Sequence, residues 1–466
     1  MKKLNILFLL FFVSVNIFSQ VFIKSWDARY GCNYTEHTQL LPLDSNGYIL
    51  AGSMISTNCG DISQPNYDST LSTYDFWIIR IDKNGNKLWD NHYGGVGDDF
   101  LTSIIKTPDN GFLLGGISKS FLSYDVSFPP LGQSDFWIIK IDSVGNKIWD
   151  GRYGGSKNEE LNQIVESDNS TYYLIGNSYS PISPSKTQNN YDSTLLTGDF
   201  WIVKIDSSGN KIWDRTFGGN MEDFGTCGVI SSGSGLIVGG YSWSSSYGNK
   251  TDPNIDSTLT YPDYWILRID SSGNIIWDRT FGGTGSDEAS AIIQTNDGNY
   301  IIGGVTDSDI GFDIVDSSRG GSDYWILKFD LSGNKIWTHR YGGPGYDGLL
   351  QLANSKDNLL LSGDSESNSG FDKSENNMGS QQGWVIEVDS NGAKRWDKTL
   401  FTPGFGFNGS AYPTDSGCFI FANATSGSSG GYKSQNNYGF GFNFWIVKLC
   451  DSTFNTSIFI PSIPKN

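Results

Sequence analysis

Residues 75–95 read DFWIIRIDKNGNKLWDNHYGG, and close copies of this stretch recur along the chain of 466 residues. Trp77 lies in an apolar strand and Trp89 in a second strand, and Gly85 between them supplies the positive φ of a tight hairpin turn. Two regular series of tryptophans, each with seven members 59 to 64 residues apart, indicate seven structural repeats. The first series stands at positions 77, 137, 201, 265, 325, 384 and 445, and the second at 26, 89, 149, 213, 277, 337 and 396.

Each repeat predicts four short strands, which we name a, b, c and d in chain order. One unit reads DDFLTSIIKT (a), FLLGGIS (b), a longer loop, DFWIIKID (c) and KIWDGRYGG (d). The strands are rich in β-branched and aromatic residues, and no segment shows an apolar period of helical length. Such units could form a sandwich or a solenoid, but four to eight of them are typical of a β-propeller. We therefore predict an all-β, seven-bladed β-propeller of four-stranded antiparallel blades.

The phase of the two tryptophan series predicts how the ring closes. The chain starts with an isolated strand d around Trp26 and finishes with strands a, b and c, ending in NFWIVKLC at Cys450. The N-terminal strand can therefore complete the last blade, which leaves no unpaired sheet edge between the two ends of the chain. We expect a signal peptide at residues 1–19, a propeller at residues 20–452 and a short C-terminal tail at residues 453–466.

The N-terminus and the net charge predict where the protein acts. MKKLNILFLLFFVSVNIFSQ has two lysines, an apolar core and a small residue, Ser19, suited to cleavage before Gln20. A membrane anchor is the alternative, but the apolar run is shorter than the ~20 residues of a spanning helix. We expect a secreted or cell-surface monomer with no transmembrane segment in the mature chain. Because 32 basic residues face 50 acidic ones, for a net charge of -18, nucleic acid is not an expected partner.

The repeat also resembles a known family. The pattern GGxGDDxxxxIIxTxDNGFLLGG, followed by SDFWIIKIDxxGNKIWDxxYGG, is similar to the SBBP-type bacterial β-propeller repeat over nearly all of residues 22–450. The resemblance implies a propeller in an exported or surface-associated protein, often with a C-terminal sorting domain. Here the chain departs from that pattern, because only DSTFNTSIFIPSIPKN follows the last strand. IDSSGNKIWD also resembles quinoprotein dehydrogenase repeats, but that class often has adjacent cysteines, which this chain lacks.

An acidic residue recurs at the start of strand a in six repeats. Six carboxylates near the axis could bind Ca²⁺, which prefers oxygen ligands, and calcium is the one cofactor that the pattern suggests. The alternative, which we favour, is that each carboxylate accepts backbone N–H groups in the turn between blades. The six residues are Glu36, Asp99, Glu159, Asp223, Asp287 and Asp347.

Antiparallel order places the long b-to-c loops and the d-to-a crossovers on one face, and the short turns on the other. Tyrosine rings beside amide and carboxylate groups in these loops suit a glycan, whereas the simpler reading is that the loops pack on their neighbours. No coherent catalytic constellation stands out, so we predict a non-catalytic binding, adhesion or scaffold module for a glycan or an extracellular protein. The alternative is a glycan hydrolase or lyase that uses axial carboxylates. The candidate loop residues are Tyr67, Asp68, Tyr191, Asp192 and Asp256.

Five cysteines in an exported chain predict disulfides. Cys418 opens strand b and Cys450 closes strand c of the same blade, so antiparallel pairing brings them together. Cys32 and Cys59 lie on one face of the first blade, and we expect them to pair as well. Cys227 falls in an inner strand and is expected to be a buried free thiol.

Overall fold

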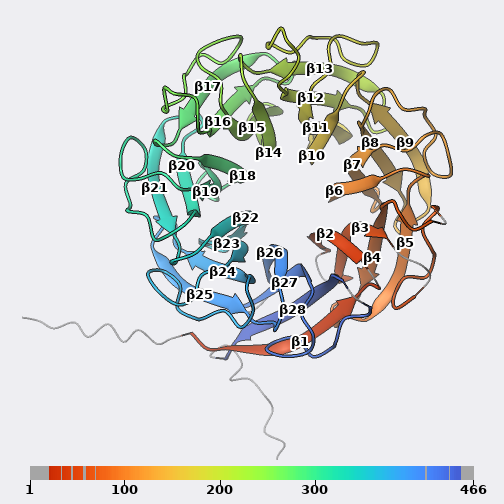
Figure 1. Ribbon diagram of the computed structural model, residues 1–466, viewed down its shortest axis with the longest axis vertical. Coiled ribbons are helices and arrows are strands. Elements are labelled where there is room, and N and C mark those ends of the chain that lie inside the picture. The colour runs from red at the N-terminus through yellow and green to blue at the C-terminus, as the bar shows by residue number, and fades with distance from the viewer. Residues whose placement is uncertain are drawn as a thin grey trace, which may run out of the picture.

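A computed structural model of the chain describes residues 20–452 apart from residues 33, 44–45, 56–58, 69, 415–416 and 440. Only the backbone is described for Tyr34, Glu36, His37 and Asn169. The predicted signal peptide and C-terminal tail lie outside the described residues. The described part holds 28 strands and a 3-10 turn, η2 (Asp168–Ser170), between two of them. The strands form seven four-stranded sheets arranged as blades around a central axis, which makes the molecule a seven-bladed β-propeller (Figure 1).

The strands of each blade follow one another outwards from the axis. The innermost strands a are β2 (Tyr34–Pro42), β6 (Asp99–Lys106), β10 (Glu159–Ser167), β14 (Asp223–Ser231), β18 (Asp287–Gln294), β22 (Asp347–Ser355) and β26 (Gly406–Thr414). Strands b are β3 (Tyr48–Ile55), β7 (Phe112–Ser118), β11 (Thr171–Ser178), β15 (Gly235–Ser242), β19 (Tyr300–Thr306), β23 (Asn358–Ser365) and β27 (Cys418–Thr425). Strands c are β4 (Asp75–Ile81), β8 (Asp135–Ile141), β12 (Asp199–Ile205), β16 (Asp263–Ile269), β20 (Asp323–Phe329), β24 (Gln382–Val388) and β28 (Asn443–Asp451). The outermost strands d are β5 (Lys87–Tyr93), β9 (Lys147–Tyr153), β13 (Lys211–Phe217), β17 (Ile275–Phe281), β21 (Lys335–Tyr341), β25 (Lys394–Leu400) and β1 (Phe22–Tyr30).

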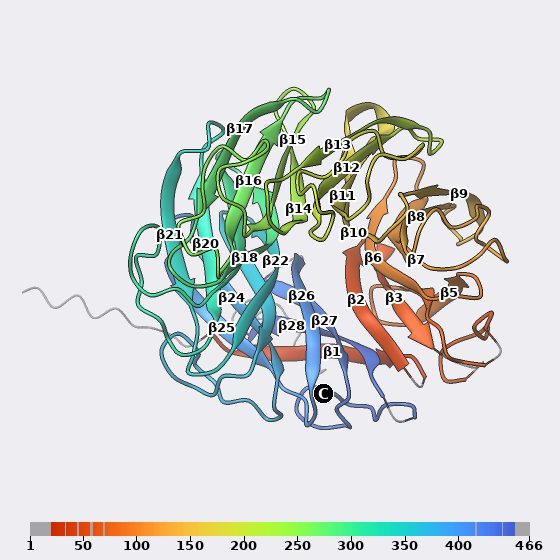
Figure 2. The ribbon, with the colours of Figure 1, turned by 45° about the horizontal axis from the view of Figure 1, so that its top comes forward.

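The ring closes as the sequence predicts, with the N-terminal strand completing the last blade. The sheet of blade 7 has the order β1-β28-β27-β26, so its outer strand comes from the opposite end of the chain (Figure 2). Strand β1 pairs antiparallel with β28 from Phe22 opposite Asp451 to Tyr30 opposite Phe444. Backbone hydrogen bonds of this single strand pair therefore join the two ends of the propeller.

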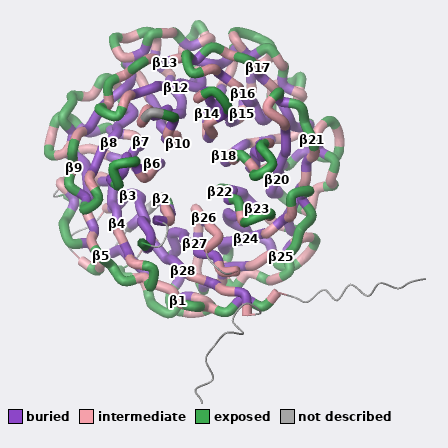
Figure 3. The backbone as a smooth tube through the Cα atoms, turned by 180° about the vertical axis from the view of Figure 1, so that it is seen from behind, coloured by how far each residue is buried: buried purple, intermediate pink, exposed green. Residues whose placement is uncertain are grey.

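The core lies between neighbouring blades and is built from aromatic contacts between strands c. The seven strand-c tryptophans are all buried. Trp137 packs on Phe76 of the preceding blade with ring centroids 5.0 Å apart, and Trp201 packs on Phe136 in the same way at 4.8 Å. Strand c is therefore apolar on both faces because each blade is covered by another on either side (Figure 3).

The Asp that follows the second tryptophan of most repeats has a structural role. In blade 2, Asp150 of strand d accepts a hydrogen bond from Nε1 of Trp137 at 3.1 Å and pairs with Lys147 at 2.7 Å. The same indole-to-carboxylate bond forms in blades 1, 3, 4, 6 and 7. The conspicuous Trp-Asp pairs of the sequence thus hold the fold together.

Candidate functional site

The acidic residues at the start of strand a are buried side chains of the blade. In each described member, one carboxylate oxygen accepts the backbone N–H of a crossover glycine four residues earlier at 2.7–2.8 Å. A serine hydroxyl at or just beyond the end of strand b also donates to each carboxylate. The fully buried residues are Asp99, Glu159, Asp223, Asp287 and Asp347, whereas the side chain of Glu36 lies outside the described part.

A second set of buried carboxylates, at the start of strand c, was not identified from the sequence. A Cβ added at Gly94 would lie 2.0 Å from Oδ1 of Asp75 and 3.0 Å from Oδ2 of Asp99, so this crossover glycine lies between two carboxylates. Burial raises the pKa of Asp75 to about 8 and the pKa of Asp99 to about 7. The sequence does carry a signal for this second set, because an Asp directly precedes the aromatic-Trp pair of strand c in five repeats. These residues are Asp75, Asp135, Asp199, Asp263 and Asp323.

Buried cations accompany most of these carboxylates. Arg152 in strand d of blade 2 holds Asp135 with Nε 2.9 Å from Oδ2, and Arg340 faces Asp323 in blade 5. Blades 3, 4 and 6 carry instead a buried loop lysine whose pKa burial lowers to about 8: Lys186, Lys250 and Lys373.

Blade 1 has His92 at the position of these arginines. Burial lowers the pKa of His92 to about 4, and neither ring nitrogen has a hydrogen-bond partner among the described residues. Across the described residues, no group of three or more His, Cys, Asp or Glu side chains is placed to hold a metal ion.

The acidic residues predicted in the long loops cap their own turns. Asp68 accepts the backbone N–H groups of Thr70 and Ser72, each at 2.9 Å. Asp192 and Asp256 make the corresponding bonds in blades 3 and 4. These bonds hold the pKa of Asp192 down at about 2.

The two predicted tyrosines contact the next blade. Tyr67 stacks on Tyr124 with ring centroids 4.1 Å apart, and a Cβ added at Gly248 would lie 2.6 Å from the ring of Tyr191. Both side chains are half-buried. Most of the predicted loop residues therefore support the loops themselves, as the simpler reading of the sequence has it.

Three other aromatic residues on the same loops are exposed and strained. Tyr124, Phe312 and Phe371 have φ of 48°, 51° and 51°, and their side chains are exposed by 63%, 69% and 70%. Each occupies the first position of a two-residue turn at the start of the b-to-c loop, closed by backbone bonds such as Gly311 with Ile314. Blades 4 and 7 have glycine at this position, Gly248 and Gly431. We call Tyr124, Phe312 and Phe371 the aromatic tips.

Cavities between blades open on the opposite face, where the short a-to-b and c-to-d turns lie. One of 400 Å³ lies between blades 6 and 7, one of 330 Å³ between blades 5 and 6, and one of 390 Å³ between blades 1 and 2. Glu387, Arg395 and Trp396 line the first, whereas Arg80, Leu88 and Trp89 occupy the matching positions in the third. The sequence pattern indicates ligand binding on the long-loop face and does not predict these cavities on the opposite face.

Both expected disulfides are present. Cys418 bonds to Cys450 within blade 7, and Cys32 bonds to Cys59 in blade 1, while Cys227 is a buried free thiol. Two disulfides fit an oxidising, extracellular environment. Within the described residues, no helix has the length and apolar character needed to cross a membrane.

Comparisons with known proteins do not establish a family. No protein-family model matches the chain. A 214-residue stretch is 25% identical to the regulatory protein FlaEY of Caulobacter vibrioides, which covers 45% of this chain and 22% of that protein, so the chain spans well under half of its relative. Among solved structures, the phage phi92 endosialidase matches over 94% of this chain and 70% of its own, at 12% identity and a TM-score of 0.44. Sqt1 from Chaetomium thermophilum matches over 93% of this chain and 98% of its own, at 11% identity and a TM-score of 0.41.

Proposed function

We propose that this protein is an exported, non-catalytic binding module whose long-loop face captures an extracellular glycan or protein. The aromatic tips carry the proposal. A non-glycine residue in the left-handed region costs roughly 1–2 kcal/mol, and glycine avoids that cost in blades 4 and 7. Phe312 and Phe371 in the same turns of blades 5 and 6 thus lower stability without filling a core, whereas Tyr124 of blade 2 also stacks on Tyr67. Backbone strain and exposure that coincide at three aromatic side chains support a role in recognition.

Further apolar side chains surround two of the tips. Phe121 and Leu122 are exposed beside Tyr124, and Ile310 and Val315 beside Phe312. An exposed aromatic ring offers a flat apolar face for the C–H face of a sugar, and it also suits an apolar anchor on a protein partner. The backbone groups and polar side chains of the same loops could hydrogen-bond to either ligand.

Several features support an extracellular setting for this function. The two disulfides, the predicted signal peptide and the similarity to the SBBP-type repeat agree with secretion or display at a cell surface. Because every blade edge at the closure is paired, the ring can act as a monomer, and the proposal requires no cofactor. Adhesion and scaffolding are the roles that such a module would serve.

The enzymatic alternative, a glycan hydrolase or lyase, would need carboxylates that reach a substrate. Asp99 and Asp223 are fully buried and accept hydrogen bonds from the chain, so neither is open to a sugar in this structure. No specific observation favours this alternative over binding.

A combined binding and turnover assay tests the proposal. The purified exported protein is applied to an array of glycans and extracellular proteins, and in parallel is incubated with the glycans under product analysis. We expect retention of at least one component without chemical change. Turnover of any glycan, or retention of nothing on the array, would refute the proposal.

A further inference from the structure

The cavity between blades 6 and 7, which we call the seam cavity, arises from the way the ring closes. In blades 1 to 5, the glycine of the c-to-d turn packs against the strand-d tryptophan of the preceding blade. Gly145 lies against Trp89, and Gly209 lies against Trp149. Blade 7 has no c-to-d turn, because β28 ends at Asp451 and its strand d is the N-terminal β1. Trp396 of blade 6 therefore lacks the turn that would cover it. Phe22 of β1 packs beside Trp396, with the two ring centroids 4.6 Å apart.

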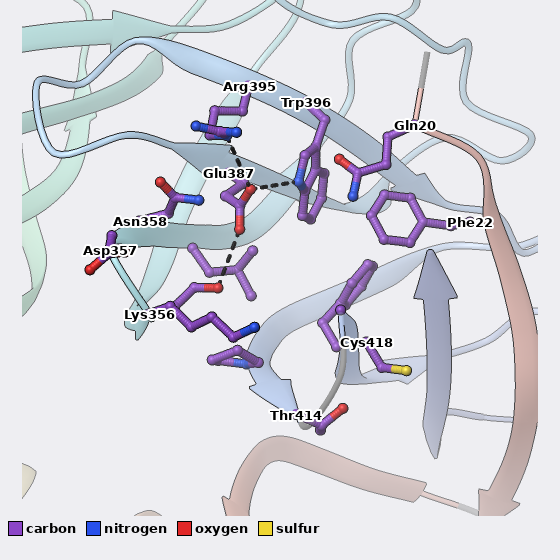
Figure 4. A pocket seen from close by; sticks show the side chains of 15 residues that line it. Gln20, Phe22, Lys356, Asp357, Asn358, Glu387, Arg395, Trp396, Thr414 and Cys418 are labelled. Carbon is purple, nitrogen blue, oxygen red and sulfur yellow. Dashed lines mark hydrogen bonds and ion pairs between the residues drawn. The ribbon is translucent and has the colours of Figure 1, made fainter. Parts of the chain in front are cut away.

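Hydrogen bonding of this tryptophan differs from the repeat for the same reason. Trp213 and Trp277 donate Nε1–H to carbonyl oxygens in the c-to-d turn of the next blade, each at 3.1 Å. Trp396 donates instead to Oε2 of Glu387 in its own blade at 2.8 Å (Figure 4). The hydroxyl of Ser355 donates to Oε1 of the same carboxylate at 3.2 Å.

Blade 6 alone places a carboxylate at this position of strand c. The other six blades have a basic residue there: Arg80, Lys140, Lys204, Arg268, Lys328 and Lys448. One residue before the tryptophan of strand d, Arg395 replaces the aliphatic residue of blades 1 to 5: Leu88, Ile148, Ile212, Ile276 and Ile336. Nε of Arg395 lies 3.8 Å from Oε2 of Glu387, so the arginine pairs with the same carboxylate that accepts the indole N–H (Figure 4). Two departures from the repeat thus coincide at one cavity.

The lining of the seam cavity identifies a class of ligand. Trp396, Phe22 and Phe419 form an aromatic wall. Asn358, Gln20 and Thr414 add neutral donors and acceptors (Figure 4). The ionisable side chains balance, because the acids Glu387 and Asp357 match the bases Arg395 and Lys356. Such a lining attracts neither a cation nor an anion by net charge, although the whole chain carries -18. Apolar rings beside charged and amide groups suit a neutral molecule with apolar faces and many hydroxyls.

We infer that the seam cavity is a second binding site, which takes a short neutral saccharide. Its volume of 400 Å³ lies at the lower end of the ~300–1,000 Å³ typical of small-ligand sites, which limits the ligand to one or two sugar residues. Hydroxyls of the sugar bond to Glu387, Arg395 and Asn358 while its ring lies against the aromatic wall. The site is on the short-turn face and is independent of the aromatic tips.

Saturation-transfer NMR of the full exported protein tests this inference, with glucose, galactose, mannose, N-acetylglucosamine and their β-1,4-linked disaccharides as probes. We expect transfer to at least one sugar, and at least a tenfold weaker affinity for the double variant E387K/R395I. That variant gives blade 6 the residues of blades 2, 3 and 5, which the fold already accommodates. If it fails to fold, E387Q, which keeps an acceptor for Trp396, is expected to weaken binding as well.

Two controls separate this site from other sugar contacts. R80A alters the matching cavity between blades 1 and 2 and should leave saccharide binding unchanged. A variant with glycine at all three aromatic tips should also keep it, so a failure of the proposed long-loop function is distinguishable from a failure of this one. Binding of no sugar by the wild-type protein, or unchanged binding by the folded E387K/R395I protein, would overturn the inference.

Discussion

His92 stands in β5 at the position that Arg152 holds in β9, opposite the strand-c tryptophan of its blade. Arg152 pairs with Asp135 and donates to four further oxygens around it, two of Ser118 and the carbonyl oxygens of Ser120 and Phe128. In blade 1, the carboxylate that corresponds to Asp135 is Asp75, whose Oδ2 accepts the backbone N–H of Tyr67, while neutral His92 stands where Arg152 would supply a charge. Blade 1 therefore lacks the buried cation that blades 2 and 5 have.

The variant His92→Arg should stabilise the protein. A guanidinium beside Asp75 would supply the missing ion pair, and hydrogen bonds to charged groups contribute about 1.5–3 kcal/mol. The gain should be larger at pH 8 than at pH 5, because Asp75, whose pKa is about 8, becomes ionised only at the higher pH. Urea unfolding of the variant and the wild type at both pH values measures this gain in the free energy of unfolding. If the variant has a lower free energy of unfolding than the wild type at both pH values, the site cannot accommodate the arginine.

The free energy of unfolding of the wild-type protein should decrease between pH 5 and pH 6.5. Burial raises the pKa of five aspartates to about 7 or 8, so the folded state keeps protons that the unfolded state has released above pH 4. His92 acts in the opposite direction over this range, because its pKa is lowered to about 4, but it is one group against five. The five are Asp75, Asp99, Asp263, Asp287 and Asp364.

Thermal unfolding followed by circular dichroism measures this dependence. The variant Asp75→Asn cannot ionise at this position, so its unfolding temperature should vary less with pH than that of the wild type. A wild-type unfolding temperature that rises from pH 5 to pH 6.5 would show that these aspartates are ionised in the folded protein.

Asp150→Ala tests the bond between strand d and the buried tryptophan. The change removes the acceptor of Trp137 and the partner of Lys147, and a buried donor left unpaired costs about 1–3 kcal/mol. Asp150→Asn, which keeps an acceptor oxygen, should cost less. Chemical denaturation of the two variants compares them, and equal stability of Asp150→Ala and the wild type would remove the structural role of the Trp-Asp pair.

Removal of the disulfide in blade 7 should weaken the closure of the ring. The double variant C418S/C450S loses a cross-link next to β1, and Cys450 is the residue paired with Ile23 of that strand. Native disulfides contribute about 2–4 kcal/mol. Cys227→Ala, which alters a buried thiol without a cross-link, serves as the control and should cost less in the same denaturation experiment. An equal loss in both would mean that the cross-link adds nothing.

The architecture could be predicted because it depends on periodic features of the sequence. Trp77 and its six counterparts are spaced by the length of a blade, and the lone strand around Trp26 shows the phase at which the ring closes. The pairing of Cys418 with Cys450 followed from the strand order once the blades were assigned. These features repeat, so errors at any one position do not alter the conclusion.

The candidate site could not be predicted in the same way, because it depends on departures from the repeat and on three-dimensional burial. Asp68 and Asp192 have the residue types of a binding loop, yet they cap turns. The strain at Phe312 and Phe371 is a backbone angle, which the letters Gly-Phe-Asp do not reveal. The seam cavity follows from a turn that blade 7 lacks, and the pairing of β1 with β28 places Phe22 beside Trp396 at its wall.

The most direct test of recognition by the aromatic tips is the triple variant Y124G/F312G/F371G on the array of glycans and extracellular proteins, together with its unfolding temperature. Glycine relieves the backbone strain at all three turns, so the variant should unfold at the same or a higher temperature than the wild type. Ile148, Ile212 and Ile336, which are exposed on the outer strands, changed together to alanine provide the matched control. We predict that the glycine variant loses retention on the array components that E387K/R395I still binds, while the control keeps them. Undiminished retention by a folded glycine variant would contradict the proposed function.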